Sequence, residues 1–207
     1  EQNTATRLGG ALVLINIWRV ILNGCKFIRN SVYRGDAGAF HAKHIGLLLC
    51  NNSIFIANSA FAFGGAISVE NSCNFINVHC NFSRNHAINK RRQTGSGGSL
   101  AVRNVYMLQN TQCIFFVNMA PSNGGAMFLG EVRYVKNNNC LFEKNIGSKG
   151  NTFKIVNGYY LRNVNVSFNR NQAFTDILQV ERYSEVYNSH CTFSYNSIKT
   201  ESRFHNY

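Results

Sequence analysis

A motif that returns at a nearly constant interval is the strongest constraint on what this 207-residue chain can fold into. Five segments read Gly-Gly-Ala followed by an apolar residue, or a near variant, and two degenerate copies come after them. The copies begin at Gly9, Ala37, Gly64, Gly97, Gly124, Gly150 and Thr175. Each contains Phe-x-x-Asn, with its phenylalanine always 18 residues after the first residue, whereas the interval between copies varies from 25 to 33 residues. Such a fixed internal spacing identifies a structural repeat whose length varies only after the asparagine.

The polarity of each copy predicts strands. Counted from zero at the first residue of a copy, positions 3, 5, 11 and 18 are apolar in all seven copies. Apolar residues two apart, in short runs broken by glycine or asparagine, are typical of strands with one buried face. No copy contains a helical stripe of ten residues. We therefore predict an all-β fold in one domain, residues 1–207: a parallel β-helix, or solenoid, of about seven rungs with three short strands per rung.

Stacked rungs about 4.8 Å apart place equivalent side chains above one another, in ladders. Position 18 predicts a phenylalanine ladder of Phe27, Phe55, Phe82, Phe115, Phe142, Phe168 and Phe193. Position 21 predicts an asparagine ladder of Asn30, Asn58, Asn85, Asn118, Asn145, Asn171 and Asn196. A second asparagine ladder is expected at position 13, comprising Asn77, Asn110, Asn137, Asn163 and Asn188. Stacked amides bond to one another, and asparagine tolerates the left-handed backbone of a bend.

These ladders account for an unusual composition. The chain has 30 asparagines and a single proline, Pro121. Central strands need every backbone N–H for pairing, which explains the scarcity of proline. A hydrophobic content of 45% excludes a disordered chain. The most apolar stretch, residues 12–22, is too short for a membrane helix and includes Arg19.

The pairing of Gly-Gly-Ala-Ile, as in Gly64–Ile67, with Phe-x-x-Asn resembles the repeats of the polymorphic outer-membrane proteins, adhesin-type surface proteins first described in chlamydiae. The resemblance extends from Gly9 to Asn196. It implies a right-handed, pectin-lyase-like parallel β-helix at a cell surface, with a role in adhesion or surface structure. Related repeats occur in other bacterial and protist surface proteins, so the resemblance does not identify the organism.

The seven cysteines are interpreted as packing residues. Five of them share position 16, namely Cys25, Cys80, Cys113, Cys140 and Cys191. Because position 18 points inward, position 16 points inward too, and buried free thiols act as small apolar groups. An odd number argues against complete disulfide pairing, and a straight ladder cannot surround a zinc ion tetrahedrally. We expect no metal site and no cofactor.

The acidic residues argue against catalysis. Polysaccharide-cleaving enzymes use clustered carboxylates, but this chain has only Asp36 and Asp176, about five rungs apart, and scattered glutamates. We therefore expect a protein that is not an enzyme. A polysaccharide lyase or hydrolase remains the alternative, and an acidic cluster brought together by a loop would favour it.

The net charge of +12 predicts a basic stripe. Position 20 lies just before the asparagine ladder, where the strand must end and release its side chains to solvent. The candidate binding residues are Arg29, Arg84, Lys144 and Arg170, with Lys90, Arg91 and Arg92 in the longest loop. The stripe is either a solvated edge or a surface for an acidic partner such as an anionic glycan or a lipid headgroup. Nucleic acid is the weaker choice, because the aromatic residues are expected in the core.

The terminal segments do not provide caps for a solenoid. Glu1–Leu8 and residues 199–207 lack an amphipathic pattern. We therefore expect a fragment or processed piece, or open ends that stack on other copies of the chain, giving fibres, or that are capped by neighbouring subunits. The function expected is a structural or adhesive module, extracellular or at the cell surface. A basic scaffold subunit of an intracellular assembly is a further alternative, consistent with free thiols.

Overall fold

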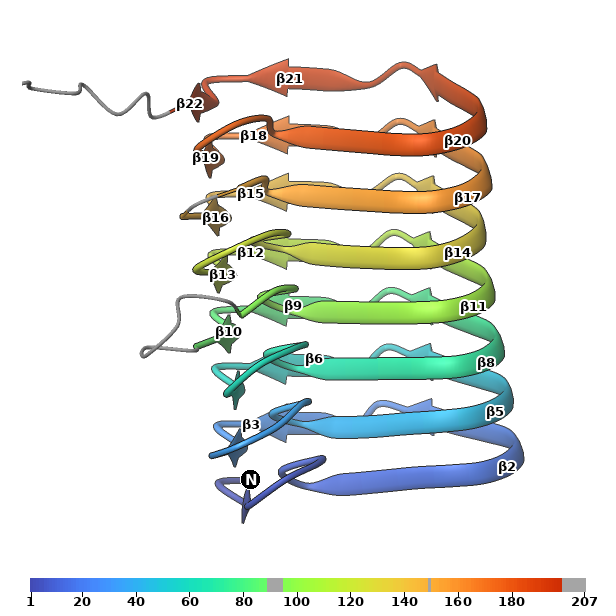
Figure 1. Cartoon of the computed structure of the whole chain (residues 1–207), viewed down its shortest axis with the longest axis vertical. Coiled ribbons are helices and arrows are strands. Elements are labelled where there is room, and N and C mark those ends of the chain that lie inside the picture. Colours follow the sequence, from blue (N-terminus) through green and yellow to red (C-terminus); the bar gives the residue numbers. More distant parts are fainter. Residues whose placement is uncertain (89–94, 149, 199–207) are drawn as a thin grey trace, which may run out of the picture.

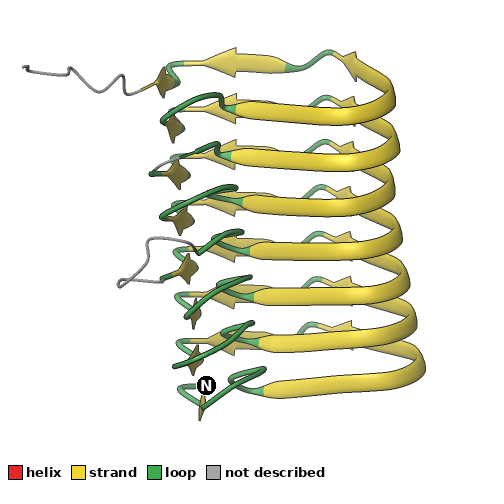
Figure 2. Ribbon diagram, in the orientation of Figure 1, coloured by secondary structure: helices red, strands yellow, loops and turns green. Residues whose placement is uncertain are grey.

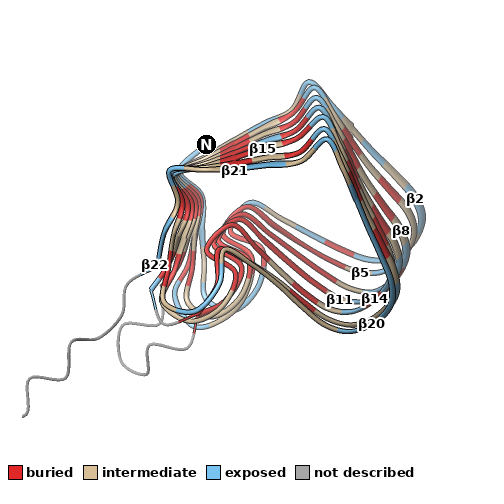
Figure 3. Ribbon diagram, turned by 90° about the horizontal axis from the view of Figure 1, so that it is seen from above, coloured by how far each residue is buried: buried red, intermediate tan, exposed pale blue. Residues whose placement is uncertain are grey.

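The computed structural model describes residues 1–88, 95–148 and 150–198, which form strands and turns only. The chain coils into a tall stack in which each rung lies on the one before it (Figures 1 and 2). All strands pair in parallel with their counterparts one repeat away, giving three sheets of eight, seven and seven strands. Seen from above, the chain runs anticlockwise as it rises, so the coil is right-handed (Figure 3). The predicted parallel β-helix of about seven rungs is confirmed.

Each rung contributes one strand to each sheet. The first strands are β2 (Leu12–Asn23), β5 (Phe40–Asn51), β8 (Ile67–Val78), β11 (Leu100–Thr111), β14 (Met127–Asn138), β17 (Phe153–Val164) and β20 (Leu178–Ser189). The second strands are β3 (Lys26–Ile28), β6 (Ile54–Ile56), β9 (Asn81–Ser83), β12 (Ile114–Phe116), β15 (Leu141–Glu143), β18 (Ser167–Asn169) and β21 (Thr192–Ser194). The third strands are β1 (Thr4–Ala5), β4 (Ser31–Val32), β7 (Ser59–Ala60), β10 (His86–Ala87), β13 (Met119–Ala120), β16 (Ile146–Gly147), β19 (Gln172–Ala173) and β22 (Ser197–Ile198).

The first strand of each rung differs from the prediction, because it is 12 residues long rather than short. It keeps its pairing through a sharp bend at position 7, where the backbone is left-handed, as at Asn104 with φ of 50°. The rung bends again at positions 15 and 20, where Gln112 and Val117 have φ of 51° and 56°. The same three positions are left-handed in all seven rungs. Three corners per rung therefore produce the cross-section in Figure 3.

The phenylalanine ladder runs through the core. Successive rings stack with centroids 4.6–5.1 Å apart and planes within 12° of parallel. The five central rings are fully buried, from Phe55 to Phe168, whereas Phe193 in the last rung is 54% exposed. The ladder expected from position 18 is present in every rung.

The asparagine ladder at position 21 is a continuous chain of buried hydrogen bonds. Asn118 shows the pattern: its Oδ1 accepts from the backbone N and Nδ2 of Asn85 at 3.0 and 3.1 Å. Its Nδ2 donates to Phe82 O at 2.9 Å and to Asn145 Oδ1 at 3.0 Å. Asn3 joins the same ladder through Asn30, and β1 pairs with β4. The N-terminal segment thus adds part of a further rung that the repeat alone did not predict.

The second asparagine ladder and the cysteines of position 16 also point inward. At position 13, each Nδ2 donates to the next Oδ1 at 2.8–2.9 Å, from Asn77 to Asn188. The buried thiols donate to carbonyl oxygens, as Cys80 Sγ does to Cys50 O at 3.3 Å. Burial raises the pKa of Cys50 well above its usual value, so this thiol stays protonated. Among the seven cysteines, all of which lie in the described part of the chain, Cys73 alone is exposed. The end-to-end association expected from the sequence stays a prediction.

Candidate functional site

The basic edge consists of Arg29, Arg84, Lys144 and Arg170, at the corner between the second and third strands. All four have left-handed φ of 52–56°, and their side chains are exposed. An ordinary strand would turn this position inward, but the left-handed corner turns it to solvent. Position 20 in the other three rungs holds Ala57, Val117 and Tyr195. Lys90, Arg91 and Arg92 lie outside the described residues.

The edge is more open towards its N-terminal end. Lys144 Nζ and Arg170 Nη1 each lie 3.9 Å from Glu143 Oε1, a loose pairing in solvent. Arg170 also lies over the Tyr195 ring, 5.7 Å from its centroid. Arg29 and Arg84 form no ion pair with any residue that the structure describes. Their charges are therefore available to a partner.

Two carboxylates meet where the sequence predicted none. Asp36 lies in the loop before β5, Glu70 on β8 and Arg103 on β11. Arg103 Nη2 donates to Asp36 Oδ2 at 3.0 Å and to Glu70 Oε1, and Phe63 N donates to Asp36 Oδ1 at 3.2 Å. The expectation of scattered carboxylates is wrong here. Linear spacing missed the pair because Asp36 comes just before one copy begins and Glu70 at position 6 of the next copy, and the Arg103 side chain of a third rung contacts both.

This acidic pair has a perturbed environment. Burial raises the pKa of Asp36, against the charge of Arg103, which lowers it. His41 lies on β5 and is only 3% exposed, and this burial lowers its pKa. His41 pairs in register with Ser68, and both His41 Nδ1 and Ser68 Oγ are buried without a hydrogen-bond partner among the described residues. The cluster is therefore polar and only partly satisfied.

A hollow of about 480 Å³ lies beside Arg103 on the same outer face. The residues that line it include Gly130, Phe128, Lys154 and Glu181. Lys154 Nζ and Glu181 Oε1 are 3.2 Å apart. The hollow exists because position 6 carries a larger residue in the neighbouring rungs, Arg103 and Val156. Its volume is in the range of small-molecule sites.

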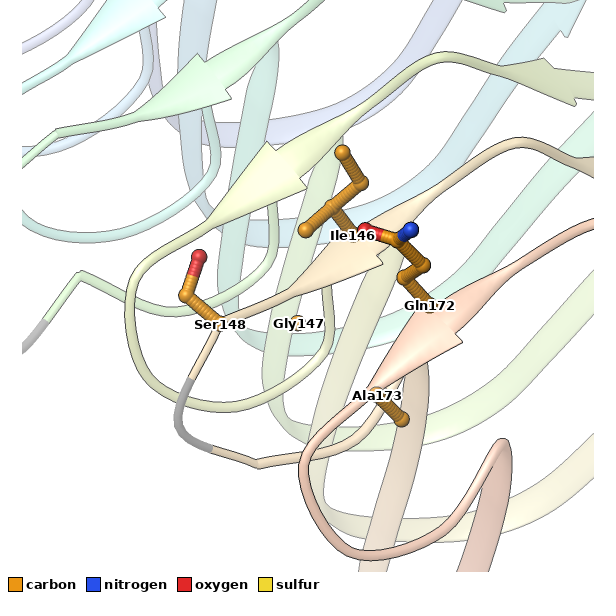
Figure 4. Close-up of a pocket in the computed structure, with 5 residues that line it drawn as sticks. All are labelled: Ile146, Gly147, Ser148, Gln172 and Ala173. Atoms are coloured by element: carbon orange, nitrogen blue, oxygen red, sulfur yellow. The ribbon is translucent and has the colours of Figure 1, made fainter. Parts of the chain in front are cut away.

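A second hollow is too small for a ligand of that size. It measures about 80 Å³ and lies between β16 and β19, lined by Ile146, Gly147, Ser148, Gln172 and Ala173 (Figure 4). This is the space of a few water molecules.

The aromatic residues are not confined to the core, which corrects the sequence-based expectation. The phenylalanines of the ladder occupy the interior, but Trp18 and several tyrosines lie outside. Trp18 is 85% exposed, Tyr106 52% and Tyr159 43%. All three occupy position 9, just after the bend of the long strand, where the side chains of positions 9 and 10 both face outward. The period-of-two pattern fails at this point, so the sequence did not separate these residues from the core.

Metal-binding clusters and membrane-spanning helices are both missing from the part of the chain that the structure describes. The described residues contain no group of three or more His, Cys, Asp or Glu side chains arranged to hold a metal ion. Among residues 1–88, 95–148 and 150–198, no helix is long and apolar enough to cross a membrane.

Comparison with known proteins adds no relative. No family model matches the chain, and neither a curated protein nor a solved structure gives a significant match. A function for this chain is therefore inferred from its fold and its surface geometry.

Proposed function

We propose that this protein is a non-enzymatic structural or adhesive β-solenoid module, extracellular or at a cell surface, that binds an acidic partner along its basic edge. One observation carries the proposal. In four of seven rungs the exposed left-handed corner residue is a cation, so Arg29, Arg84, Lys144 and Arg170 follow one line along the coil. The resemblance of the repeat to surface adhesins supports the location.

A line of charges suits a partner that is itself extended. The rungs are about 4.8 Å apart, so neighbouring cations on the edge are separated by one or two rungs, about 5 to 10 Å. This spacing is close to the screening length of about 8 Å at physiological ionic strength. Charges separated by so short a distance act together on an anionic polymer or surface. Binding of this kind weakens as salt rises.

The test is binding to a heparin-coated surface, with dextran as the neutral probe, across a salt titration. The triple variant R84Q/K144Q/R170Q removes three charges from the edge. The control variant R7Q/R34Q/R182Q removes three exposed charges elsewhere. We expect the wild type and the control to bind heparin in a salt-dependent manner and the edge variant to bind at least tenfold more weakly. Equal losses in both variants, or binding that ignores salt, would contradict the proposal.

The acidic pair supports a second candidate function, a polysaccharide-processing enzyme. Asp36 and Glu70 both contact Arg103, which also lines a ligand-sized hollow, and burial raises the pKa of Asp36. Two carboxyl groups in different environments are the arrangement that glycoside hydrolysis uses. Against it, both share the Arg103 guanidinium, which holds them as an ion-paired cluster.

A reducing-end assay on a panel of acidic and neutral polysaccharides tests this candidate. Turnover lost in D36N and E70Q would establish it, and no turnover by the wild type would exclude these substrates. G130V is a further variant, because a Cβ at Gly130 meets its nearest atoms at 3.8 and 3.9 Å, which is ordinary contact. Filling the hollow without disturbing the fold separates loss of substrate binding from loss of structure.

A further inference from the structure

The long strands carry aromatic and basic side chains after their bend. In Figure 3 this part of the long strands lies on the other side of the coil from the corner between the second and third strands. The outward side chains that come after the bend in β11, β14, β17 and β20 form one surface. We call it the tyrosine face, and it consists of Tyr106, Arg133, Tyr134, Tyr159, Arg162 and Tyr187. Tyr106, Tyr159 and Tyr187 are 52%, 43% and 48% exposed. Aromatic rings this open to solvent are a feature of binding surfaces.

The rings and cations of this face hold one another in place. Tyr106 and Tyr134 pack with centroids 5.2 Å apart and planes at 60°, and Tyr134 meets Tyr159 edge to face at 5.8 Å. The Arg133 guanidinium lies 5.9 Å and 5.7 Å from the centroids of Tyr106 and Tyr134. These contacts order the side chains before any partner arrives, which lowers the entropy cost of binding.

The fold does not require this chemistry. Position 12 is Ile21, Leu49 and Ile76 in the first three rungs but Gln109, Lys136, Arg162 and Tyr187 in the last four. The backbone pairing is the same throughout, as the register of β5 with β8 and of β11 with β14 shows. The change from aliphatic to polar and cationic residues therefore serves the surface and not the stacking of rungs.

The charge of the face selects an anionic partner. Arg133, Lys136 and Arg162 point outward, and the acid that meets the tyrosines is Glu185, whose Oε1 accepts from Tyr159 Oη at 3.3 Å. The phenol hydroxyl groups and guanidinium groups offer hydrogen bonds to a polymer rich in hydroxyl groups. The outward tyrosines and cations lie at positions 9, 10 and 12 of successive rungs, so they line up along the coil axis and fit a linear partner.

From this geometry we infer that the tyrosine face binds a linear polysaccharide bearing carboxylate or sulfate groups, laid along the coil axis over rungs 4 to 7. The acidic groups pair with Arg133 and Arg162, and the sugar hydroxyl groups bond to the tyrosine hydroxyl groups. The inference is independent of the basic edge, because the two surfaces share no residue.

Single-stranded nucleic acid fits the same charge but not the same ring geometry. Bases bind to such proteins by stacking flat on exposed aromatic faces. Here the rings of Tyr106, Tyr134 and Tyr159 are inclined to one another by 60° and 67°. Arg133 lies over two of the ring faces. The face therefore offers hydroxyl groups and charges in preference to a stacking platform.

The test compares two variants of the face with a matched control. Y106L/Y134L/Y159L removes rings and hydroxyl groups, R133Q/R162Q removes charge, and W18L alters an exposed aromatic residue in the first rung. The probes are hyaluronan and heparin oligosaccharides and an oligodeoxythymidine strand, measured by calorimetry on folded protein. We expect both face variants to bind one or both glycans at least tenfold more weakly, with W18L like the wild type.

Three outcomes would overturn the inference. The first is unchanged glycan affinity in both face variants. The second is a loss confined to R84Q/K144Q/R170Q, which would leave the basic edge as the glycan site. The third is tighter binding of oligodeoxythymidine than of either glycan, reduced by the same tyrosine substitutions. A thermal melt of each variant confirms that the half-exposed substitutions leave the fold intact.

Discussion

Phe115 and Phe116 are neighbours on β12, and they show how the inside and the outside of the coil differ. Phe115 is fully buried between Phe82 and Phe142, with ring centroids 4.9 and 4.6 Å away. Phe116 points outward, with its ring centroid 5.4 Å from Lys144 Nζ. Position 18 is phenylalanine in every rung, whereas position 19 is Ile, Ile, Ser, Phe, Glu, Asn and Ser. The interior repeats because each rung packs on its copies, and the exterior varies because only solvent or a partner contacts it.

The largest effect that separates the two regions should come from these two phenylalanines. F115A opens a cavity in the middle of the ring stack and is expected to cost about 4 kcal/mol of the free energy of unfolding. F116A removes a ring that is partly in water and is expected to cost less than about 1 kcal/mol. Chemical denaturation of both variants measures the difference. Similar losses of unfolding free energy in the two variants would mean that a ring of the stack stabilises the fold no more than an outer side chain does.

A buried ladder asparagine and an exposed asparagine pair provide the next comparison. N118A leaves the backbone N–H of Asn85, one N–H of its Nδ2 group and the carbonyl of Phe82 buried without their partner, while the other Nδ2 N–H still donates to Phe55 O. Each such group costs about 1–3 kcal/mol, so a total near ~3 kcal/mol is expected. In the matched control, N51A removes a solvent-exposed bond from Asn51 Nδ2 to Asn23 Oδ1 and is expected to cost less than about 0.5 kcal/mol. A large loss in N51A would show that amide stacking stabilises the coil even in water.

The same division explains what could be predicted from sequence. The interior was predictable, because Phe115 and Asn118 recur at fixed positions and their roles follow from stacking. The corner at position 20 was predictable too, since Arg84 cannot point inward before a buried asparagine. The meeting of Asp36 and Glu70 was not, because the two acids occupy different positions of the repeat and meet only through the Arg103 side chain of a third rung. Tyr134 was missed for a different reason: a bend in the strand interrupts the alternation from which burial was read.

A smaller effect tests the backbone of the corner and not its side chains. Val117 has φ of 56°, a left-handed conformation that a β-branched residue adopts only with strain. V117G relieves this strain and is expected to raise the free energy of unfolding by up to about 1 kcal/mol, after the entropy cost of glycine. The control is I114G, which lies on β12 of the same rung and is expected to be destabilising. If V117G were destabilising as well, the side chain of Val117 would contribute more than its backbone strain removes.

The smallest effect links the exterior to pH. Burial lowers the pKa of His41 and of His86 below their usual value of 6.5. Between the lowered pKa and 6.5 the unfolded chain binds more protons than the folded one, so stability is complete above pH 6.5 and falls as the pH falls. Asp36 acts in the opposite sense, because burial raises its pKa above 3.8 and acid relieves its charge.

A variant without the two histidines separates their contribution to the pH dependence of stability from that of Asp36. The variant H41Q/H86Q should lose less stability than the wild type between about pH 7 and pH 5, as measured by denaturation at each pH. The difference between the two curves then reports histidine protonation alone, because Asp36 is present in both proteins. If the two proteins gave parallel curves of stability against pH, both imidazoles would gain access to water on protonation at little cost in free energy. In that case the outer face over Ser68, where His41 Nδ1 has no partner among the described residues, opens more readily than the ladders inside the coil.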